Sequence, residues 1–259
     1  MMKLKLLIFL PLLSCALFQG DKEFSENDYP IQSPKEFESF LSQKSNEFVK
    51  TSRRKIIMPY RSERRYLHSL VKEIQIPNKK FFGESKDIDF IIVKSKAPYY
   101  LSVPPNKIVL STALFGEYIE NENLLASIIT YELIRLENLL YPRKISAPIG
   151  VISEKDLIKH TQVSRTTRSQ IHKWSHRILK RTIFDESTYL LWMQIVMRNT
   201  KNFEVHYSGE EKVLSEERDF KAFIIQDEKK SGTTFEQTKP ERRVPRVFYS
   251  MLERFKNAR

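Results

Sequence analysis

Apolar residues recur at helical spacing along most of this chain, and the pattern begins near residue 33. The run Ser33-Pro34-Lys35-Glu36 favours a helix start, because it places a capping serine, a proline and a glutamate in the order of a capping box. The apolar residues that follow lie on one helical face: Phe37, Phe40, Leu41 and Phe48. A second helix is predicted over residues 61–74 from the same spacing of Leu67, Leu70, Val71 and Ile74.

Short apolar runs in the middle of the chain predict strands. Residues 87–94 (DIDFIIVK) are typical of a buried strand, and residues 99–101 and 107–110 predict two more. Pro104-Pro105 separates the last two, which indicates a turn between them.

The rest of the chain returns to helical spacing. A helix capped by Asn121 or Asn123 is expected to run to Leu139, before Pro142 ends it. Further elements are predicted as helices over 163–181, 185–199 and 244–256, a strand over 219–227 and a polar loop over 228–241. Together these elements predict an α+β fold, mostly helical, in a single domain.

The first residues have the pattern of an export signal. Lys3 and Lys5 precede an apolar run from Leu6 to Leu13, which is shorter than the roughly 20 residues that a membrane-spanning helix needs. The run ends in Leu12-Leu13-Ser14-Cys15, which resembles the lipobox of bacterial lipoproteins. We therefore expect a signal peptide over residues 1–14, a lipidated tether over 15–33 and one domain over 34–259.

Cys15 is the only cysteine in the chain, so a disulfide within the chain is excluded. The resemblance implies that this cysteine carries acyl chains that anchor the protein to a bacterial membrane. An ordinary cleaved signal, or an uncleaved signal anchor, is the alternative. The residue after the cysteine is Ala16, whereas many lipoproteins that stay at the inner membrane have an aspartate at this position. This favours the outer membrane.

The charge of the chain is strongly positive, with a formal net charge of +12. Such a protein attracts anionic lipid head groups or acidic polymers, and for an exported, tethered protein lipid is the nearest partner. No specific nucleic-acid partner is expected. The basic residues cluster at Arg53, Arg54, Lys55, Arg61, Arg64 and Arg65, and again along the 165–181 helix.

The stretch from Ala97 to Glu137 resembles the core of the HtpX-type zinc metallopeptidases, the group that includes CAAX-prenyl peptidases. In that family a strand pair and turn lead through an apolar segment and an acidic linker to a helix that bears H-E-x-x-H. Residues 107–115, 117–122 and the helix after them follow this order. The resemblance implies a zincin-like metallopeptidase core with a small sheet packed on helices.

The zinc motif itself is missing. Its positions read Tyr131-Glu132-Leu133-Ile134-Arg135, so only the glutamate is kept. In the family, two histidines four residues apart bind zinc, and the glutamate polarises the metal-bound water. Arginine offers a metal no lone pair, and its positive charge would repel the ion. The alternative interpretation is an ordinary helix in which Glu132 and Arg135 form a surface ion pair.

Two other features bear on a metal. Glu186 could occupy the position of the family's third ligand, although Leu190 then replaces the expected aspartate. His172 and His176 have the i,i+4 spacing that could hold one ion, but the basic helix around them is unfavourable for a dication. Neither feature completes a site, and zinc is not expected.

Other catalytic chemistries find no support in the sequence. The chain has no G-x-S-x-G nucleophile elbow and, with six glycines, no glycine-rich phosphate loop. The leading expectation is a pseudoenzyme: a peptidase-like lipoprotein that binds peptide or protein in the cell envelope, with an ion pair where zinc would sit. The alternatives are an active metal-dependent hydrolase with a relocated site near His172 and His176, and a basic envelope-binding protein.

Overall fold

A computed structural model describes residues 29–30, 33–141, 144–145, 153–203, 213–231, 239 and 243–258. Cys15 and the predicted signal peptide lie outside these residues, as does most of the tether. None of the described helices has the length and apolar character needed to cross a membrane.

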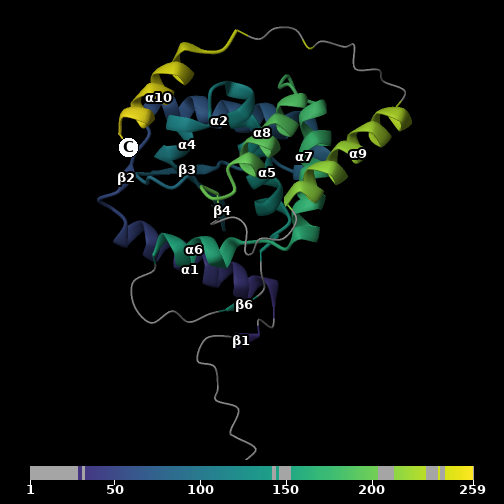
Figure 1. Ribbon diagram of the computed structural model, residues 1–259. Coiled ribbons are helices and arrows are strands. Elements are labelled where there is room, and N and C mark those ends of the chain that lie inside the picture. The colour runs from purple at the N-terminus through teal and green to yellow at the C-terminus, as the bar shows by residue number, and fades with distance from the viewer. Residues whose placement is uncertain are drawn as a thin grey trace, which may run out of the picture.

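The described fold is α+β and mostly helical, as predicted (Figure 1). Its strands are β1 (Tyr29–Pro30), β2 (Ile56–Ile57), β3 (Asp89–Val93), β4 (Tyr100–Val103), β5 (Lys107–Ser111) and β6 (Lys144–Ile145). Its first helices are α1 (Pro34–Thr51), α2 (Arg61–Gln75), the 3₁₀ turn η1 (Ile76–Asn78), α3 (Lys79–Phe82), α4 (Thr112–Glu117) and α5 (Glu122–Glu137). The later ones are α6 (Glu154–Thr161), α7 (Arg165–Lys180), α8 (Ser187–Arg198), α9 (Val213–Ser231) and α10 (Arg246–Asn257).

Four strands form one sheet in the order β2-β3-β5-β4. β3 and β5 run parallel, while β4 and β2 lie antiparallel at the two edges. β4 and β5 are joined by the predicted turn, in which the Pro104–Pro105 peptide bond is cis. The central strands read as continuous apolar runs because helices cover both faces of the sheet.

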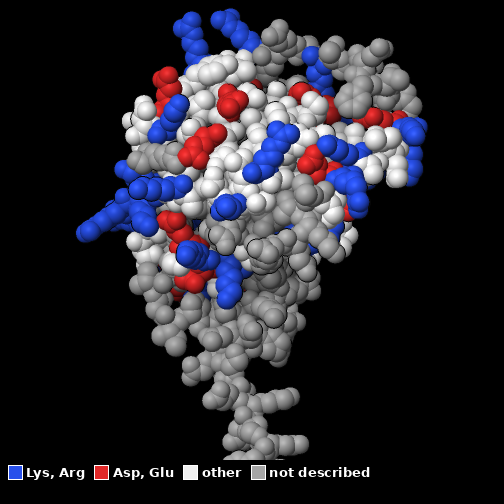
Figure 2. All heavy atoms as spheres, viewed as in Figure 1, with Lys and Arg blue, Asp and Glu red and all other residues white. Residues whose placement is uncertain are grey.

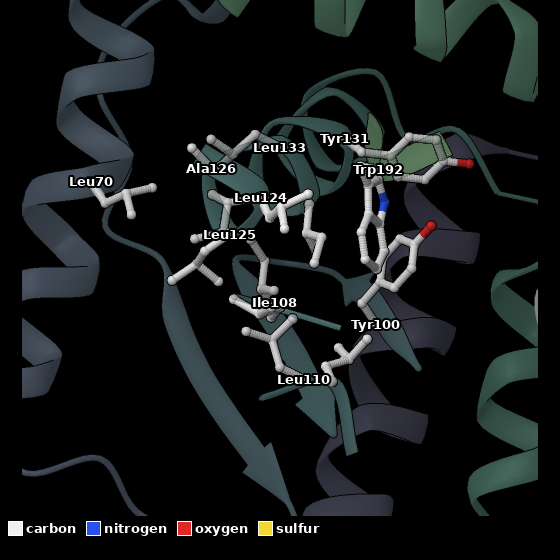
Figure 3. Close-up of a cluster of buried hydrophobic side chains, with 14 of the residues drawn as sticks. Leu70, Tyr100, Ile108, Leu110, Leu124, Leu125, Ala126, Tyr131, Leu133 and Trp192 are labelled. Carbon is white, nitrogen blue, oxygen red and sulfur yellow. The ribbon is translucent and has the colours of Figure 1, made fainter. Parts of the chain in front are cut away.

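Each face of the sheet has its own core. On one face, side chains of α5 and α8 pack on Tyr100, Ile108 and Leu110, and Figure 3 shows this cluster around Tyr131 and Trp192. On the other face, Phe48 of α1 and Leu157 of α6 cover the alternate residues of the same strands. Figure 1 shows α1 and α6 together on that side, opposite the remaining helices.

Most predicted helix limits agree with the structure within a few residues. Ser33 caps α1 in a capping box with Glu36, as the sequence predicted. Asn121 caps α5, since its side chain accepts a hydrogen bond from the Leu124 N–H. The short elements β2, α3, α4 and α6 were not predicted as such.

The strand predicted over 219–227 is wrong, because these residues belong to α9. Phe220 and Ile224 of this helix are buried one turn apart, whereas Ile225 is exposed, which is helical rather than alternating burial. The predicted loop over 228–241 is therefore also wrong at its start, where α9 continues to Ser231. Trp174 on α7 is 41% exposed, whereas Ile171 on the same helix is buried.

Candidate functional site

Helix α5 brings Tyr131, Glu132 and Arg135 into the interior. Glu132 is fully buried and Arg135 is 3% exposed, so the interpretation of this pair as a surface ion pair is wrong. The Arg135 Nη1 donates to both carboxylate oxygens of Glu132, each at 2.9 Å. Its Nη2 donates to the carbonyl oxygen of Thr161, the last residue of α6. Residues 131–135 therefore contain an internal ion pair that also joins α5 to α6.

The surroundings of Arg135 keep it charged. Burial lowers its pKa, but Glu132 and the nearby tyrosines more than reverse this, and the pKa of Arg135 is raised overall. The guanidinium also lies 5.9 Å from the ring centre of Tyr131 and 5.2 Å from that of Tyr141. Burial raises the pKa of Tyr131, so its phenol stays neutral. The helix thus presents a fixed cation and a neutral ring where the family's motif has two metal-binding imidazoles.

A small cavity remains beside this pair. It measures about 20 Å³, roughly the space of one water molecule, and is lined by Tyr100, Tyr131, Arg135, Thr161, Gln162, Val163, Arg168 and His172. Among the described residues, the Arg135 Nε and the His172 Nε2 are buried without a hydrogen-bond partner. Such a cavity suits an ordered water and is too small for a peptide side chain.

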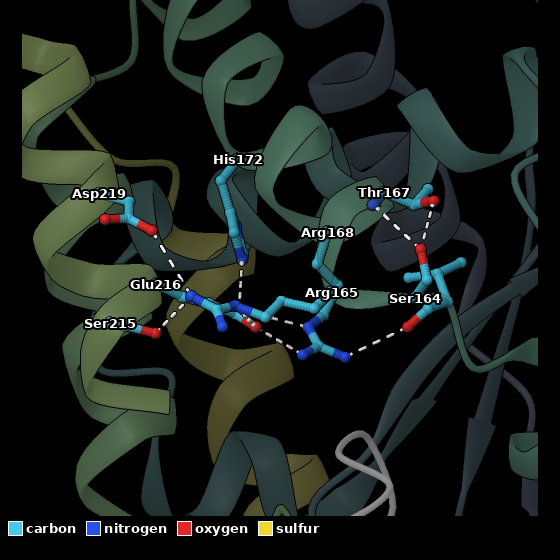
Figure 4. Close-up of polar contacts among 9 residues, drawn as sticks. Ser164, Arg165, Thr167, Arg168, His172, Ser215, Glu216 and Asp219 are labelled. Atoms are coloured by element: carbon cyan, nitrogen blue, oxygen red, sulfur yellow. Dashed lines mark hydrogen bonds and ion pairs between the residues drawn. The ribbon is translucent and has the colours of Figure 1, made fainter. Parts of the chain in front are cut away.

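His172 joins this site from α7, and Figure 4 shows its contact with Glu216 of α9. Its Nδ1 lies 2.8 Å from the hydroxyl of Tyr189, and its Nε2 lies 3.8 Å from a carboxylate oxygen of Glu216. Glu216 also accepts a 2.6 Å hydrogen bond from Arg168. Burial lowers the pKa of His172 although Glu216 opposes this, so the imidazole is neutral at pH 7.

Burial alone would raise the pKa of Glu216, but His172 and Arg168 outweigh it, and the pKa of this carboxyl is lowered. Glu216 is therefore an anion at neutral pH. Arg165 adds to the network by contacting Ser215 and, at 3.5 Å, Asp219. The polar contacts of Figure 4 accordingly join α7 to α9 through paired charges.

The other predicted metal candidates lie apart from this cavity. Glu186, just before α8, forms a 2.7 Å ion pair with Lys239. Lys239 also donates to the carbonyl oxygen of Leu179 at 2.9 Å, near the end of α7. His176 packs against the rings of Phe220 and Phe223. Burial lowers the pKa of His176, while Glu186 opposes the shift.

The structure therefore brings Tyr131, Arg135 and His172 together and leaves Glu186 and His176 outside the cavity lining. In the described part of the chain, no three His, Cys, Asp or Glu side chains form a group that could hold a metal ion. Cys15, the predicted lipidation site, lies outside the described residues.

Sequence reasoning missed several residues of this site, above all Arg168, Glu216 and Tyr189. A signal for Arg168 was present, since it precedes His172 by four residues and so shares its helical face. Glu216 gave no such signal, because its segment was assigned partly to a strand. Only the packing of α9 against α7 brings this carboxylate to the imidazole.

The basic residues fall into two groups. The arginines of α7 pair with carboxylates of α9, including Arg177 with Asp227 at 2.7 Å. By contrast, the predicted cluster at Arg53, Arg54, Lys55, Arg61, Arg64 and Arg65 is exposed. Figure 2 shows Lys and Arg side chains gathered on the side where β2 lies.

No protein-family model matches this chain, and no curated protein matches it either.

Proposed function

We propose that the chain is a non-catalytic, membrane-anchored lipoprotein with a zincin-like core, similar to the HtpX-type zinc metallopeptidases without their zinc site. Its lipid anchor would be on Cys15, in the outer rather than the inner membrane. Its body would bind a peptide or protein of the cell envelope instead of cleaving it.

The observation that carries this proposal is the buried pair of Glu132 and Arg135 at the positions of the zinc motif. A buried ion pair is costly to form unless it is well hydrogen-bonded. Here both oxygens of the carboxylate and both terminal nitrogens of the guanidinium have partners. A permanent cation, the Arg135 guanidinium, thus pairs with the glutamate that in the family's motif would polarise a metal-bound water.

The order of elements also supports the proposal. The β4–β5 hairpin leads into the short helix α4, then into residues 118–121, and then into α5. This is the order that the resemblance implies for a zinc-binding helix. The antiparallel edge strand β4 also contacts α5, as the T-shaped pair of Tyr100 and Tyr131 illustrates.

The first test is the metal content of the full chain, purified in mild detergent without a histidine tag or chelator. Elemental mass spectrometry should find much less than one zinc per chain. One equivalent of zinc, lost on replacing His172 or His176 by alanine, would overturn the non-catalytic reading in favour of a relocated site.

A second test examines the family relationship. The double variant Tyr131→His/Arg135→His restores H-E-x-x-H, and both positions line the cavity that His172 also lines. Three imidazoles are enough protein ligands for a zinc site with one open position. We expect the double variant to bind about one zinc, and the triple variant with His172→Ala to bind it more weakly.

The single variant Tyr131→His is the matched control, because it adds one imidazole but keeps the repelling guanidinium. It should bind no zinc. A folded double variant that also binds none would show that α5 does not have the geometry of a zinc-binding helix.

A further inference from the structure

Residues 52–72 are strongly basic. They contain seven Lys and Arg residues and a single acidic residue, Glu63. Glu63 is buried and forms an ion pair with Arg254, so it does not neutralise this segment at the surface. We call the exposed side chains at the start of the segment the β2–α2 patch, which consists of Arg53, Arg54, Met58, Tyr60, Arg61, Arg64 and Arg65.

The arginines of the β2–α2 patch differ from those of α7. Arg168 and Arg177 of α7 pair with Glu216 and Asp227 of α9, so their charges are neutralised within the fold. None of the five patch arginines has a carboxylate within ion-pair distance among the described residues. The β2–α2 patch therefore holds guanidinium groups that can bind an external anion, and guanidinium binds phosphate in a bidentate manner.

The arginines of α2 point the same way. Arg61, Arg64 and Arg65 are spaced by three and four residues, so they share one face of the helix, which is exposed. The opposite face, with Leu67 and Leu70, is buried in the core. Figure 2 shows Lys and Arg side chains projecting from the molecule on the side where Figure 1 places β2. The cations of the patch can therefore meet one extended anionic surface.

Two large apolar side chains stand among these cations. Met58 and Tyr60 are 63% and 62% exposed, while Pro59 between them is buried. The backbone here is tied to α10, because Arg254 donates to the carbonyl oxygen of Met58. The same guanidinium lies 4.0 Å from the ring centre of Tyr60. Met58 and Tyr60 are therefore presented to the outside from a fixed position beside the arginines.

A phospholipid bilayer offers partners for both kinds of side chain. Anionic head groups attract Lys and Arg, and tyrosine and apolar side chains settle at the boundary between head groups and acyl chains. A nucleic acid or an acidic polymer supplies the charge but not the hydrocarbon that Met58 would enter. The combination of free arginines with Met58 and Tyr60 therefore favours a bilayer among anionic partners.

We infer that the β2–α2 patch docks on an anionic phospholipid surface, with Met58 and Tyr60 at the level of the head groups. Exposed charges are screened by salt, so the contact is reversible. It orients the body on the membrane rather than holding the chain there by itself. The inference goes beyond the proposed function and rests on this patch, and neither the anchor on Cys15 nor residues 131–135 contribute to it.

The test uses the full chain with Cys15→Ser, which cannot be lipidated, and measures binding by sedimentation with sucrose-loaded vesicles. At low salt the chain should bind vesicles of equal parts phosphatidylglycerol and phosphatidylcholine. It should bind vesicles of phosphatidylcholine alone roughly tenfold more weakly or less, because they carry no net charge. Binding to the anionic vesicles should fall steeply as salt is added.

Charge variants locate the surface. Each Lys or Arg near an anionic bilayer strengthens binding roughly fivefold, so Arg64→Gln/Arg65→Gln should weaken binding roughly 25-fold. Lys229→Gln/Lys230→Gln is the matched control, because it removes the same charge from two exposed lysines of α9, on the far side of the molecule from β2 in Figure 1. The control should change binding by about twofold or less, since its charges lie more than a Debye length from the docked surface.

A label in the patch separates insertion from loose attraction. Cys15 is the only cysteine, so Met58→Cys in the Cys15→Ser chain carries an environment-sensitive fluorophore at that one position. Its emission should shift to the blue on anionic vesicles. The same label on Ile225→Cys should not shift, because Ile225 is also exposed, at 54%, but lies on α9.

Equal effects of the two double variants, equal binding to neutral vesicles, or an unshifted label at residue 58 would overturn the inference. So would binding of a single-stranded oligonucleotide that Arg64→Gln/Arg65→Gln loses, while no vesicles bind. The chain in these experiments is never lipidated, and the zinc measurements involve other residues. A failure here therefore remains distinguishable from a failure of the proposed function.

Discussion

Replacing Arg135 by methionine tests the main physical claim about the site. The substitution keeps an unbranched side chain of similar length but removes the charge. It leaves the carboxylate of Glu132, which is fully buried, without its guanidinium partner. The carbonyl of Thr161 loses its donor at the same time.

The expected loss is large because the remaining charge stays buried. Breaking a buried ion pair by removing one partner costs about 3–5 kcal/mol. Natural domains unfold with only about 5–15 kcal/mol in total, so this variant would lose a large fraction of its stability. For a domain of this size each kcal/mol corresponds to about 2–4 °C, so the melting temperature should fall by roughly 6–20 °C.

Urea unfolding, followed by far-ultraviolet circular dichroism, would measure the change. The double variant Glu132→Leu/Arg135→Met removes both charges and should recover most of the loss, because an apolar pair of similar volume replaces a buried ion pair at little cost. Lys86→Met is the matched control. Lys86 pairs at 2.8 Å with Glu137, which lies on α5 as Glu132 does, but the Lys86 side chain is 48% exposed. Losing this exposed ion pair should cost about 1 kcal/mol or less.

Two outcomes would refute the reasoning. If Arg135→Met were no more damaging than Lys86→Met, Glu132 would not depend on a buried guanidinium. If the double variant were as unstable as Arg135→Met, the lost stability would come from poorer packing or from the unpaired carbonyl of Thr161. The charge of Glu132 would then not be the reason that arginine occupies this position.

The remaining predictions concern pH, the tether and a helix end. Burial lowers the pKa of His172 and His176, so the unfolded chain binds more protons than the folded chain below about pH 6.5. The free energy of unfolding should therefore fall as the pH decreases from about 6.5. Urea titrations at several pH values would measure this change. A His172→Gln variant should lose part of this dependence, and an unchanged pH profile would contradict the buried, neutral imidazole. Cys15→Ser should abolish incorporation of labelled palmitate and release the chain from membranes, and retention on membranes would instead indicate an uncleaved signal anchor. Lys239→Met should lower the free energy of unfolding in urea by about 1–2 kcal/mol, because it removes the donor to the Leu179 carbonyl and the partner of Glu186. A smaller effect than that of Lys86→Met would contradict this role.

Sequence patterns predicted an element correctly where the residues that cause it lie close together in the chain. The capping box at Ser33 depends on residues three apart, and it formed as predicted. The β4–β5 hairpin follows from two apolar runs around a proline turn. That residues 131–135 cannot bind zinc as H-E-x-x-H does likewise follows from residue identity alone, since no fold gives arginine a free lone pair.

The prediction over 219–227 failed because its apolar residues are ambiguous within a short window. Phe220 and Ile224 fit a helical face as well as a short buried strand, and packing against α7 decides between them. The same packing brings Glu216 to His172 and Arg168. These contacts join residues more than forty positions apart, and no local pattern records them.

The sequence by itself determined the single cysteine, the mostly helical α+β class and the fact that residues 131–135 carry no histidine. Only the tertiary structure decided that Glu132 and Arg135 are buried together rather than exposed. A helical i,i+3 pair forms equally well in water or in a core, and its neighbours decide which. Here the carbonyl of Thr161 on α6 and the ring of Tyr141 close over the pair, so its burial comes from segments that its own sequence cannot place.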